Sequence, residues 1–133
     1  MEHIIKNLKV VGFYNEGCES NGIRLEDENG VEYALYSYHE QGCCEVHYLD
    51  FDSLALSEFE GLLFDFDTED LSNSIERVEG SGIRLKPNNG HPIFIPGYSH
   101  NNGFYSDDIT LVFCRYDDDV YCQIDVTDCQ PEY

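Results

Sequence analysis

The chain has 133 residues, of which 27 are acidic and 7 are basic, so its formal net charge is −20 at pH 7. Hydrophobic residues make up 41% of it and aromatic residues 14%, a content that excludes an extended acidic polymer and predicts a folded core. A charge of this sign excludes direct binding of nucleic acid phosphates and favours basic protein surfaces. At this length we expect one compact domain over residues 1–133.

A first strand is expected from Ile4 to Tyr14, followed by a loop over 15–21. Lys6 and Lys9 interrupt the apolar residues of this strand, so the segment has the pattern of neither a secretion signal nor a membrane span. We therefore expect a cytoplasmic protein with no membrane contact, in which the six cysteines are thiols rather than disulfides.

A short segment occurs twice. Residues 22–30 read Gly-Ile-Arg-Leu-Glu-Asp-Glu-Asn-Gly, and residues 82–90 read Gly-Ile-Arg-Leu-Lys-Pro-Asn-Asn-Gly. Each copy predicts a strand that ends in an Asn-Gly tight turn, in which both turn residues take positive φ. The match continues into the next strand, and we interpret the copies as a degenerate duplication with repeat units about 22–51 and 82–111. The alternative is convergence of two hairpins on similar turn chemistry.

Between the two copies, apolar patterns predict strands over 31–38, 43–51 and 62–66. A short helix is expected from an N-cap at Asp52 or Ser53 to a stop at Gly61. The segment 68–79 is polar and fits either a loop or a short helix.

After the second copy, Pro92 and Pro96 restrict 93–95 to an edge or irregular position. Residues 109–116 and 120–127 form a final hairpin, in which pairing Tyr116 with Val120 would place Cys114 opposite Cys122 on the core face. The predicted fold class is mainly β, at the margin of α+β. It is an antiparallel sheet of hairpins with an internal pseudo-duplication and one short helix.

Charge is distributed unevenly along the chain. Between Arg24 and Arg77 there is no Lys or Arg, whereas fifteen carboxylates fall in that span. From 80 to 106 the pattern reverses, with two bases and no acid, and the last 27 residues are acidic again. A surface built from the first copy and the final hairpin tip would therefore carry a strong negative potential.

Two segments resemble a family of small bacterial and phage domains of uncharacterised function. Residues 40–48 read Glu-Gln-Gly-Cys-Cys-Glu-Val-His-Tyr and residues 100–106 read His-Asn-Asn-Gly-Phe-Tyr-Ser. The family pattern is a Gln-x-Cys-Cys-Glu run before a short helix, then an Asn-Gly-Tyr-Tyr-Ser-like run, and the likeness covers about 22–61 and 90–112. The chain departs from the pattern at Gly42 and Phe104. The resemblance implies a phage or mobile-element setting in a bacterial host cell, where small acidic proteins often inhibit host systems.

Metal and catalytic sites are weakly indicated. His39, Cys43, Cys44, Glu45 and His47 are residue types that zinc uses, but adjacent cysteines on a strand point to opposite faces and there is no Cys-x-x-Cys. Residues 65–76 have calcium-loop spacing, but an Asp stands where the sharp turn needs Gly. Nearby carboxylates would disfavour a catalytic thiolate. We therefore predict no metal, no cofactor, no catalytic residue and no enzyme activity.

The charge pattern favours a small acidic inhibitor of a basic, nucleic-acid-handling protein, such as a nuclease of the host or a competitor. Its carboxylates would act as a DNA mimic and occupy the places of phosphates, as in an anti-CRISPR, anti-restriction or immunity protein. The alternative is a small-molecule or metal-binding module that uses the loops 38–45 and 98–106. The expected partner-binding residues are Asp50, Asp52, Asp65, Asp67, Glu69, Asp70, Asp117, Asp118 and Asp119.

Overall fold

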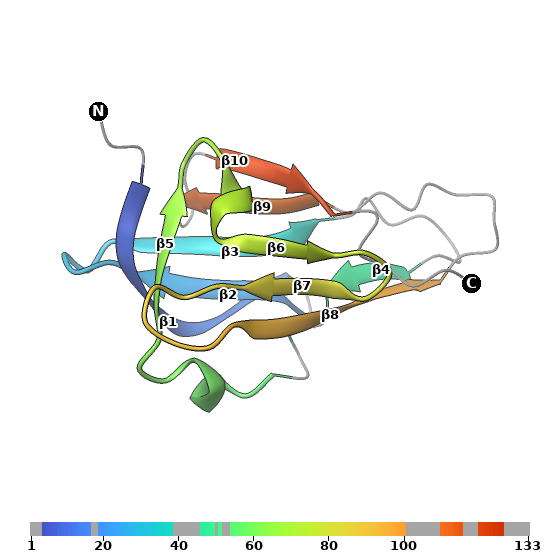
Figure 1. Ribbon diagram of the computed structural model, residues 1–133, viewed down its shortest axis with the longest axis horizontal. Coiled ribbons are helices and arrows are strands. Elements are labelled where there is room, and N and C mark those ends of the chain that lie inside the picture. Colours follow the sequence, from blue (N-terminus) through green and yellow to red (C-terminus); the bar gives the residue numbers. More distant parts are fainter. Residues whose placement is uncertain are drawn as a thin grey trace.

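The computed structural model describes residues 4–16, 19–38, 46–49, 51, 54–100, 110–115 and 120–126 (Figure 1). Within these residues, strands dominate and helical structure is limited to two 3-10 turns, η1 and η2. The mainly β, antiparallel fold class that the sequence predicts is therefore confirmed. The elements are β1 (Ile4–Glu16), β2 (Glu19–Glu26), β3 (Glu32–Tyr38), β4 (Val46–Leu49), η1 (Leu56–Phe59), β5 (Leu63–Asp67), η2 (Leu71–Asn73), β6 (Ile75–Val78), β7 (Gly82–Leu85), β8 (Ile93–His100), β9 (Thr110–Arg115) and β10 (Val120–Asp125).

The strands form two antiparallel sheets. One has six strands in the order β10-β9-β3-β2-β1-β5, and the other has four in the order β4-β8-β7-β6. In Figure 1 the four-stranded sheet lies over one face of the six-stranded sheet. Their inward side chains share one core, which burial of apolar surface stabilises. Its members include Leu8, Ile23, Leu25, Leu35, Leu49, Phe64, Phe66, Ile75, Ile83, Leu85, Ile95, Leu111 and Phe113.

The two copies of the repeated segment form hairpins in the same register. In the first, β2 pairs with β3 so that Gly22 lies opposite Tyr36. In the second, β7 pairs with β8 so that Gly82 lies opposite Pro96. The two registers are the same when sixty is added to each residue number: Ile23 lies opposite Leu35 in the first hairpin, and Ile83 lies opposite Ile95 in the second. The sequence match therefore corresponds to a matching backbone geometry.

Each hairpin is completed by a strand from the other half of the chain. The strand that follows the first hairpin, β4, pairs with β8 of the second hairpin. The strand that follows the second hairpin, β9, pairs with β3 of the first. The chain thus enters the four-stranded sheet for β4, returns to the six-stranded sheet for β5, enters the four-stranded sheet again for β6 to β8, and ends in the six-stranded sheet with β9 and β10.

The predicted Asn-Gly tight turns are not formed as expected. In the first copy, only Gly30 has positive φ, at 83°, and residues 28–30 make a three-residue loop closed by bonds between Asp27 and Gly30 and between Asp27 and Val31. In the second copy, the residues 86–92 make a wide loop. Its asparagines bond to the start of β5 instead of closing a turn: the Asn88 amide donates to the Leu63 carbonyl, and the Leu63 amide donates to Asn89 Oδ1.

Several boundaries also differ from the prediction. Strands β1 and β2 extend into 15–21, where a loop was expected. The expected helix is the single 3-10 turn η1, whose N-cap is Ala55; the Glu58 carboxylate accepts from the Ala55 amide at 2.8 Å. Asp52 and Ser53 lie outside the described residues. The polar segment 68–79 contains both η2 and the strand β6, because Ile75 is buried in the core although its neighbours are polar.

Pro96 lies within a strand of the four-stranded sheet. Residues Ile93 to Pro96 pair with β7, whereas Gly97 to His100 pair with β4. Each half of β8 therefore has one paired side, and the proline, which lacks a backbone donor, lies where the partner changes. The expectation of an edge or irregular position is correct for each half of the strand, although β8 as a whole stands between two neighbours.

The final hairpin is formed, but its register differs from the predicted one. Val120 lies opposite Cys114, and a bulge then places Cys122 opposite Phe113. The two cysteines are therefore not opposite each other. Neither is in a disulfide; Cys114 is buried and Cys122 half-buried. Leu111 and Phe113 point into the shared core, so the predicted core face of β9 is wrong by one residue.

Candidate binding surface

Four of the nine predicted partner-binding residues lie in the part of the chain that the structure describes. Asp65 and Asp67 are on β5, and Glu69 and Asp70 are in the segment between β5 and η2. The other five lie outside the described residues: Asp50, Asp52, Asp117, Asp118 and Asp119. Most of the alternative ligand loops, 39–45 and 101–106, also lies outside them.

The Asp65 side chain makes hydrogen bonds within the protein. Its Oδ1 accepts from the Asn7 backbone amide at 2.9 Å and from Asn88 Nδ2 at 2.8 Å. Asn7 has a φ of 58° at an irregular point of β1, and its side chain donates to Glu28 Oε1 at 2.9 Å. Asp65 therefore fastens β1 and the loop after β7 to β5, which is a structural role that its sequence context does not indicate.

Asp67, Glu69 and Asp70 form a short acidic segment that faces outward. Asp67 Oδ1 accepts from the Glu69 amide at 2.8 Å, and Asp70 Oδ1 accepts from the Ser72 amide at 3.0 Å. The Ser72 hydroxyl and amide bonds lower the pKa of Asp70, since they stabilise its charged form. Two of these carboxylates are thus held in defined positions by the turns that they close. We call Asp67, Glu69 and Asp70 the acidic segment.

The acidic segment lies beside β10. Cys122 Sγ donates to the Asp67 carbonyl oxygen at 3.4 Å. Burial, followed by the charges of Asp67 and Asp70, raises the pKa of Cys122 to about 11. The thiol is therefore protonated at neutral pH and cannot serve as a nucleophilic thiolate there.

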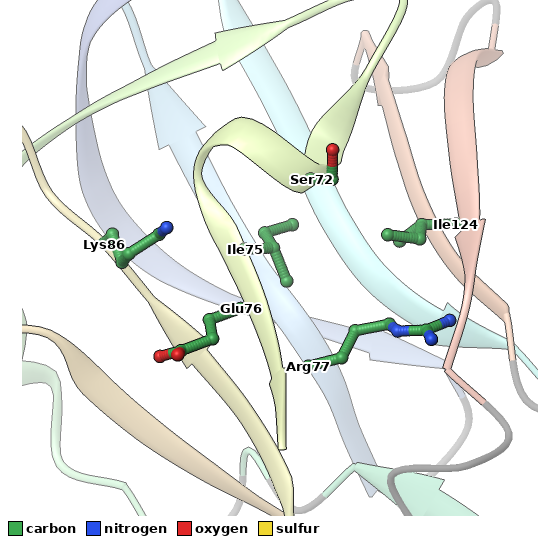
Figure 2. Close-up of a pocket in the computed structure, with 6 residues that line it drawn as sticks. All are labelled: Ser72, Ile75, Glu76, Arg77, Lys86 and Ile124. Atoms are coloured by element: carbon green, nitrogen blue, oxygen red, sulfur yellow. The ribbon is translucent and has the colours of Figure 1, made fainter. Parts of the chain in front are cut away.

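A groove of about 530 Å³ lies between β6 and β10, next to the acidic segment. Figure 2 shows Ile75 of β6 and Ile124 of β10 on its two sides, with Ser72 of η2 at one end. Arg77 extends from β6 towards β10 (Figure 2) and its Nη1 donates to the Asp125 carbonyl at 2.9 Å. Glu76 and Lys86 complete the lining. The groove is thus a boundary between the outer strands of two different sheets.

No pattern in the sequence predicts this groove. The four residues of β6, Ile-Glu-Arg-Val, are too few to show a strand period, and Ile75 and Ile124 are 49 positions apart in the chain. The one sequence feature that favours a strand here is the tetrapeptide itself, in which β-branched residues flank a charged pair.

Metal-binding groups do not gather in the part of the chain described here. Among these residues, no group of three or more His, Cys, Asp or Glu side chains could hold a metal ion. Within the calcium-loop spacing over 65–76, Asp65, Asp67 and Asp70 accept hydrogen bonds from separate partners. The cysteines of the possible zinc site, Cys43 and Cys44, lie outside the described residues.

No protein-family model, curated protein or solved structure matches this chain. The resemblance to small bacterial and phage domains thus stays a prediction from the sequence. Within the described ranges, no helix is long and apolar enough to span a bilayer.

Proposed function

We propose that this protein is a small acidic inhibitor that binds a basic, nucleic-acid-handling protein through charge mimicry. The observation that carries the proposal is the acidic segment, in which the carboxylates of Asp67 and Asp70 are positioned by backbone hydrogen bonds on a chain with a net charge of −20. Carboxylates fixed in advance lose little conformational freedom when they meet a lysine- and arginine-rich groove.

The arrangement of bases supports the same function. Arg24 pairs with Glu32 at 3.2 Å and Arg84 pairs with Glu76 at 2.9 Å, and neither pair uses a carboxylate of the acidic segment. Arg77, the base that follows the segment in the chain, has its Nη1 on a backbone carbonyl of β10. A phage anti-defence protein, such as an anti-CRISPR or anti-restriction factor, and an immunity protein against a nuclease toxin both need such a surface. The alternative function, small-molecule or metal binding by the loops 38–45 and 98–106, has no supporting contact among the described residues.

The first test is capture of a partner from bacterial lysate on tagged protein at about 0.05 M and about 0.5 M salt, because exposed ionic contacts are screened across this range. We expect a basic nuclease, toxin or DNA-binding protein that is released at high salt. Capture that does not depend on salt, or no basic protein at either salt, would contradict the proposal.

A variant then tests the acidic segment in direct binding to the captured partner. Asp67→Asn, Glu69→Gln and Asp70→Asn together remove three charges, while each Asn keeps an Oδ1 acceptor for its turn. We expect at least about tenfold weaker binding, which corresponds to about 1.4 kcal/mol. The control is Glu60→Gln with Glu79→Gln, which removes two charges at exposed positions outside the segment. Equal affinity of both variants would rule out the acidic segment as the contact.

A further inference from the structure

Both repeated segments end in the same dipeptide, as Asn29-Gly30 and as Asn89-Gly90. Asparagine is one of the thermolabile residues. Its side chain is most reactive before glycine, because a residue without a Cβ leaves its backbone nitrogen open to attack the preceding side chain. Exposure does not distinguish the two pairs, since all four residues are exposed. Their hydrogen bonds and their packing do.

In the second copy, the Asn89 side chain is held at both ends. Its Oδ1 accepts from the Leu63 amide at 2.9 Å, and its Nδ2 donates to the Gly61 carbonyl at 2.9 Å. The glycine that follows is packed, because a Cβ on Gly90 would lie 2.5 Å from Leu62 Cδ2. To turn towards the Gly90 nitrogen, the Asn89 side chain would have to lose both bonds.

In the first copy, the Asn29 side chain makes no hydrogen bond within the described part of the chain; its backbone amide donates to Asp27 Oδ1 at 2.8 Å. A Cβ on Gly30 would meet nothing within 4 Å, so the space around this glycine is open. The Gly30 amide donates to the Asp27 carbonyl at 3.1 Å. That bond has to open before the nitrogen can react, but the Asn29 side chain has no bond to lose.

We propose that Asn29 is a site of spontaneous deamidation and isoaspartate formation, and that Asn89 is protected by its bonds to Gly61 and Leu63. In the reaction, the Gly30 nitrogen gives its proton to water and attacks Asn29 Cγ. A bond forms between this nitrogen and Cγ, the bond from Cγ to Nδ2 breaks, and ammonia leaves with a proton. Water then opens the resulting succinimide at either carbonyl, which yields aspartate or isoaspartate.

The modification changes the charge and the backbone of the loop over 28–30. Either product places a new carboxylate next to Glu28 and makes the formal net charge of −20 more negative by one. Isoaspartate also adds an atom to the main chain inside a loop that Asp27 closes through its bonds to Gly30 and Val31. This inference goes beyond the proposed function and does not depend on it.

The test follows both asparagines in one sample of the folded protein, kept reduced at mildly alkaline pH. Peptide mass spectrometry measures the replacement of the amide by a carboxyl group, and methylation by an isoaspartyl methyltransferase detects isoaspartate. The pairs Asn21-Gly22 and Asn102-Gly103 are assigned by their own fragment ions and do not enter the comparison. We expect Asn29 to react at least about tenfold faster than Asn89, a difference of about 1.4 kcal/mol in barrier.

A parallel sample in concentrated guanidinium chloride is the control for local sequence. There the bonds of Asn89 are lost, so we expect the two asparagines to react at similar rates. The variant Asn29→Gln keeps the amide but lengthens the side chain, so the ring would need six members. We expect the product at this position to disappear, while thermal unfolding shows that the fold is retained.

The outcomes are distinct. Faster reaction at Asn29 in the folded protein alone supports the inference. Equal rates at Asn29 and Asn89 in the folded protein, the same ratio of rates in folded and denatured chains, or no reaction at Asn29 in the folded protein would each overturn it. None of these measurements involves a partner, so a failure here would leave the proposed function as it stands.

Discussion

At the scale of single residues, the charge of a carboxylate does not reveal its role. Asp65 and Asp67 stand two positions apart on one face of β5, and both are half-buried. Asp65 bonds to Asn7 and Asn88, which lie 58 and 23 positions away in the chain. Asp67 closes a turn with its near neighbour Glu69. Contacts over such separations leave no pattern in the sequence, so both residues looked like equivalent contact residues.

Asp65 should therefore matter for stability more than for binding. In Asp65→Ala, the Asn7 amide loses its acceptor while it remains partly buried. We therefore expect the free energy of unfolding to fall by about 1–3 kcal/mol. Asp65→Asn retains an oxygen that can face Asn7 and should lose less. Urea unfolding of both variants at one pH measures the difference. If the Ala and Asn variants match the unchanged protein, the network around Asp65 contributes nothing measurable.

At the scale of elements, the repeated hairpins depend on a glycine at one equivalent position. A Cβ on Gly22 would lie 2.0 Å from the Leu35 carbonyl oxygen, and one on Gly82 would lie 2.1 Å from the Ile95 carbonyl oxygen. In the first hairpin, the missing side chain also leaves room for Tyr14 and Tyr36, on the two neighbouring strands, to stack with ring centroids 4.7 Å apart. The glycine that opens each copy is thus a packing requirement, not a turn signal.

Replacement of either glycine by alanine should distort its hairpin. For Gly22→Ala and Gly82→Ala we expect losses of at least about 2 kcal/mol, because the new methyl group meets backbone atoms that cannot rotate away. Gly12→Ala is the control, since its Cβ would lie 3.6 Å from the end of the Arg24 side chain and should cost within about 0.5 kcal/mol. Thermal and urea unfolding of the three variants give the comparison. Similar losses at all three positions would mean that the loss of stability comes from the intrinsic difference between glycine and alanine in a strand, not from the contact of the new methyl group with the neighbouring backbone.

Local patterns predicted most of the strands and the hairpins β2–β3, β7–β8 and β9–β10, but not how the hairpins pair with other strands. Apolar patterns located β1, β3, β5, β9 and β10 because these strands bury one face in the core. The short β6 and the wide loop over 86–92 were missed, since both are determined by contacts with β5 and β10. The bulge in β10 also changed which side chains of the last hairpin face each other. The groove was unpredictable for the same reason, because it forms between two sheets.

At the scale of the whole molecule, the six-stranded sheet curls until its two outer strands approach. Cys122 of β10 reaches the carbonyl of Asp67 on β5, and Phe66 of β5 contacts Phe113 of β9 with centroids 5.1 Å apart. The bond from β10 to β5 is made by a thiol instead of a backbone ladder. Whether the Cys122 thiol is protonated therefore affects the stability of the curled sheet.

Stability should consequently depend on pH through Cys122. Its pKa in the folded protein is raised from 9.0 to about 11, so the folded state keeps the proton that the unfolded chain loses first. The contribution of the protonated Cys122 thiol to the free energy of unfolding is therefore complete below about pH 9, and it is lost as the pH rises towards 11. Urea unfolding at pH 7.5 and pH 10 should show a larger loss for the unchanged protein than for Cys122→Val, which cannot ionise. An equal loss in both would mean that Cys122 has the same pKa folded and unfolded.

The exchange of strands between the two hairpins also governs the order in which the chain can complete its fold during synthesis. β3 is made early, but its neighbour β9 begins at Thr110, and β4 must wait for β8. Until β9 has left the ribosome, β3 has an unpaired edge of the kind that promotes association between nascent chains. The fifteen carboxylates between Arg24 and Arg77, a span without a base, would repel such nascent chains from one another during this interval.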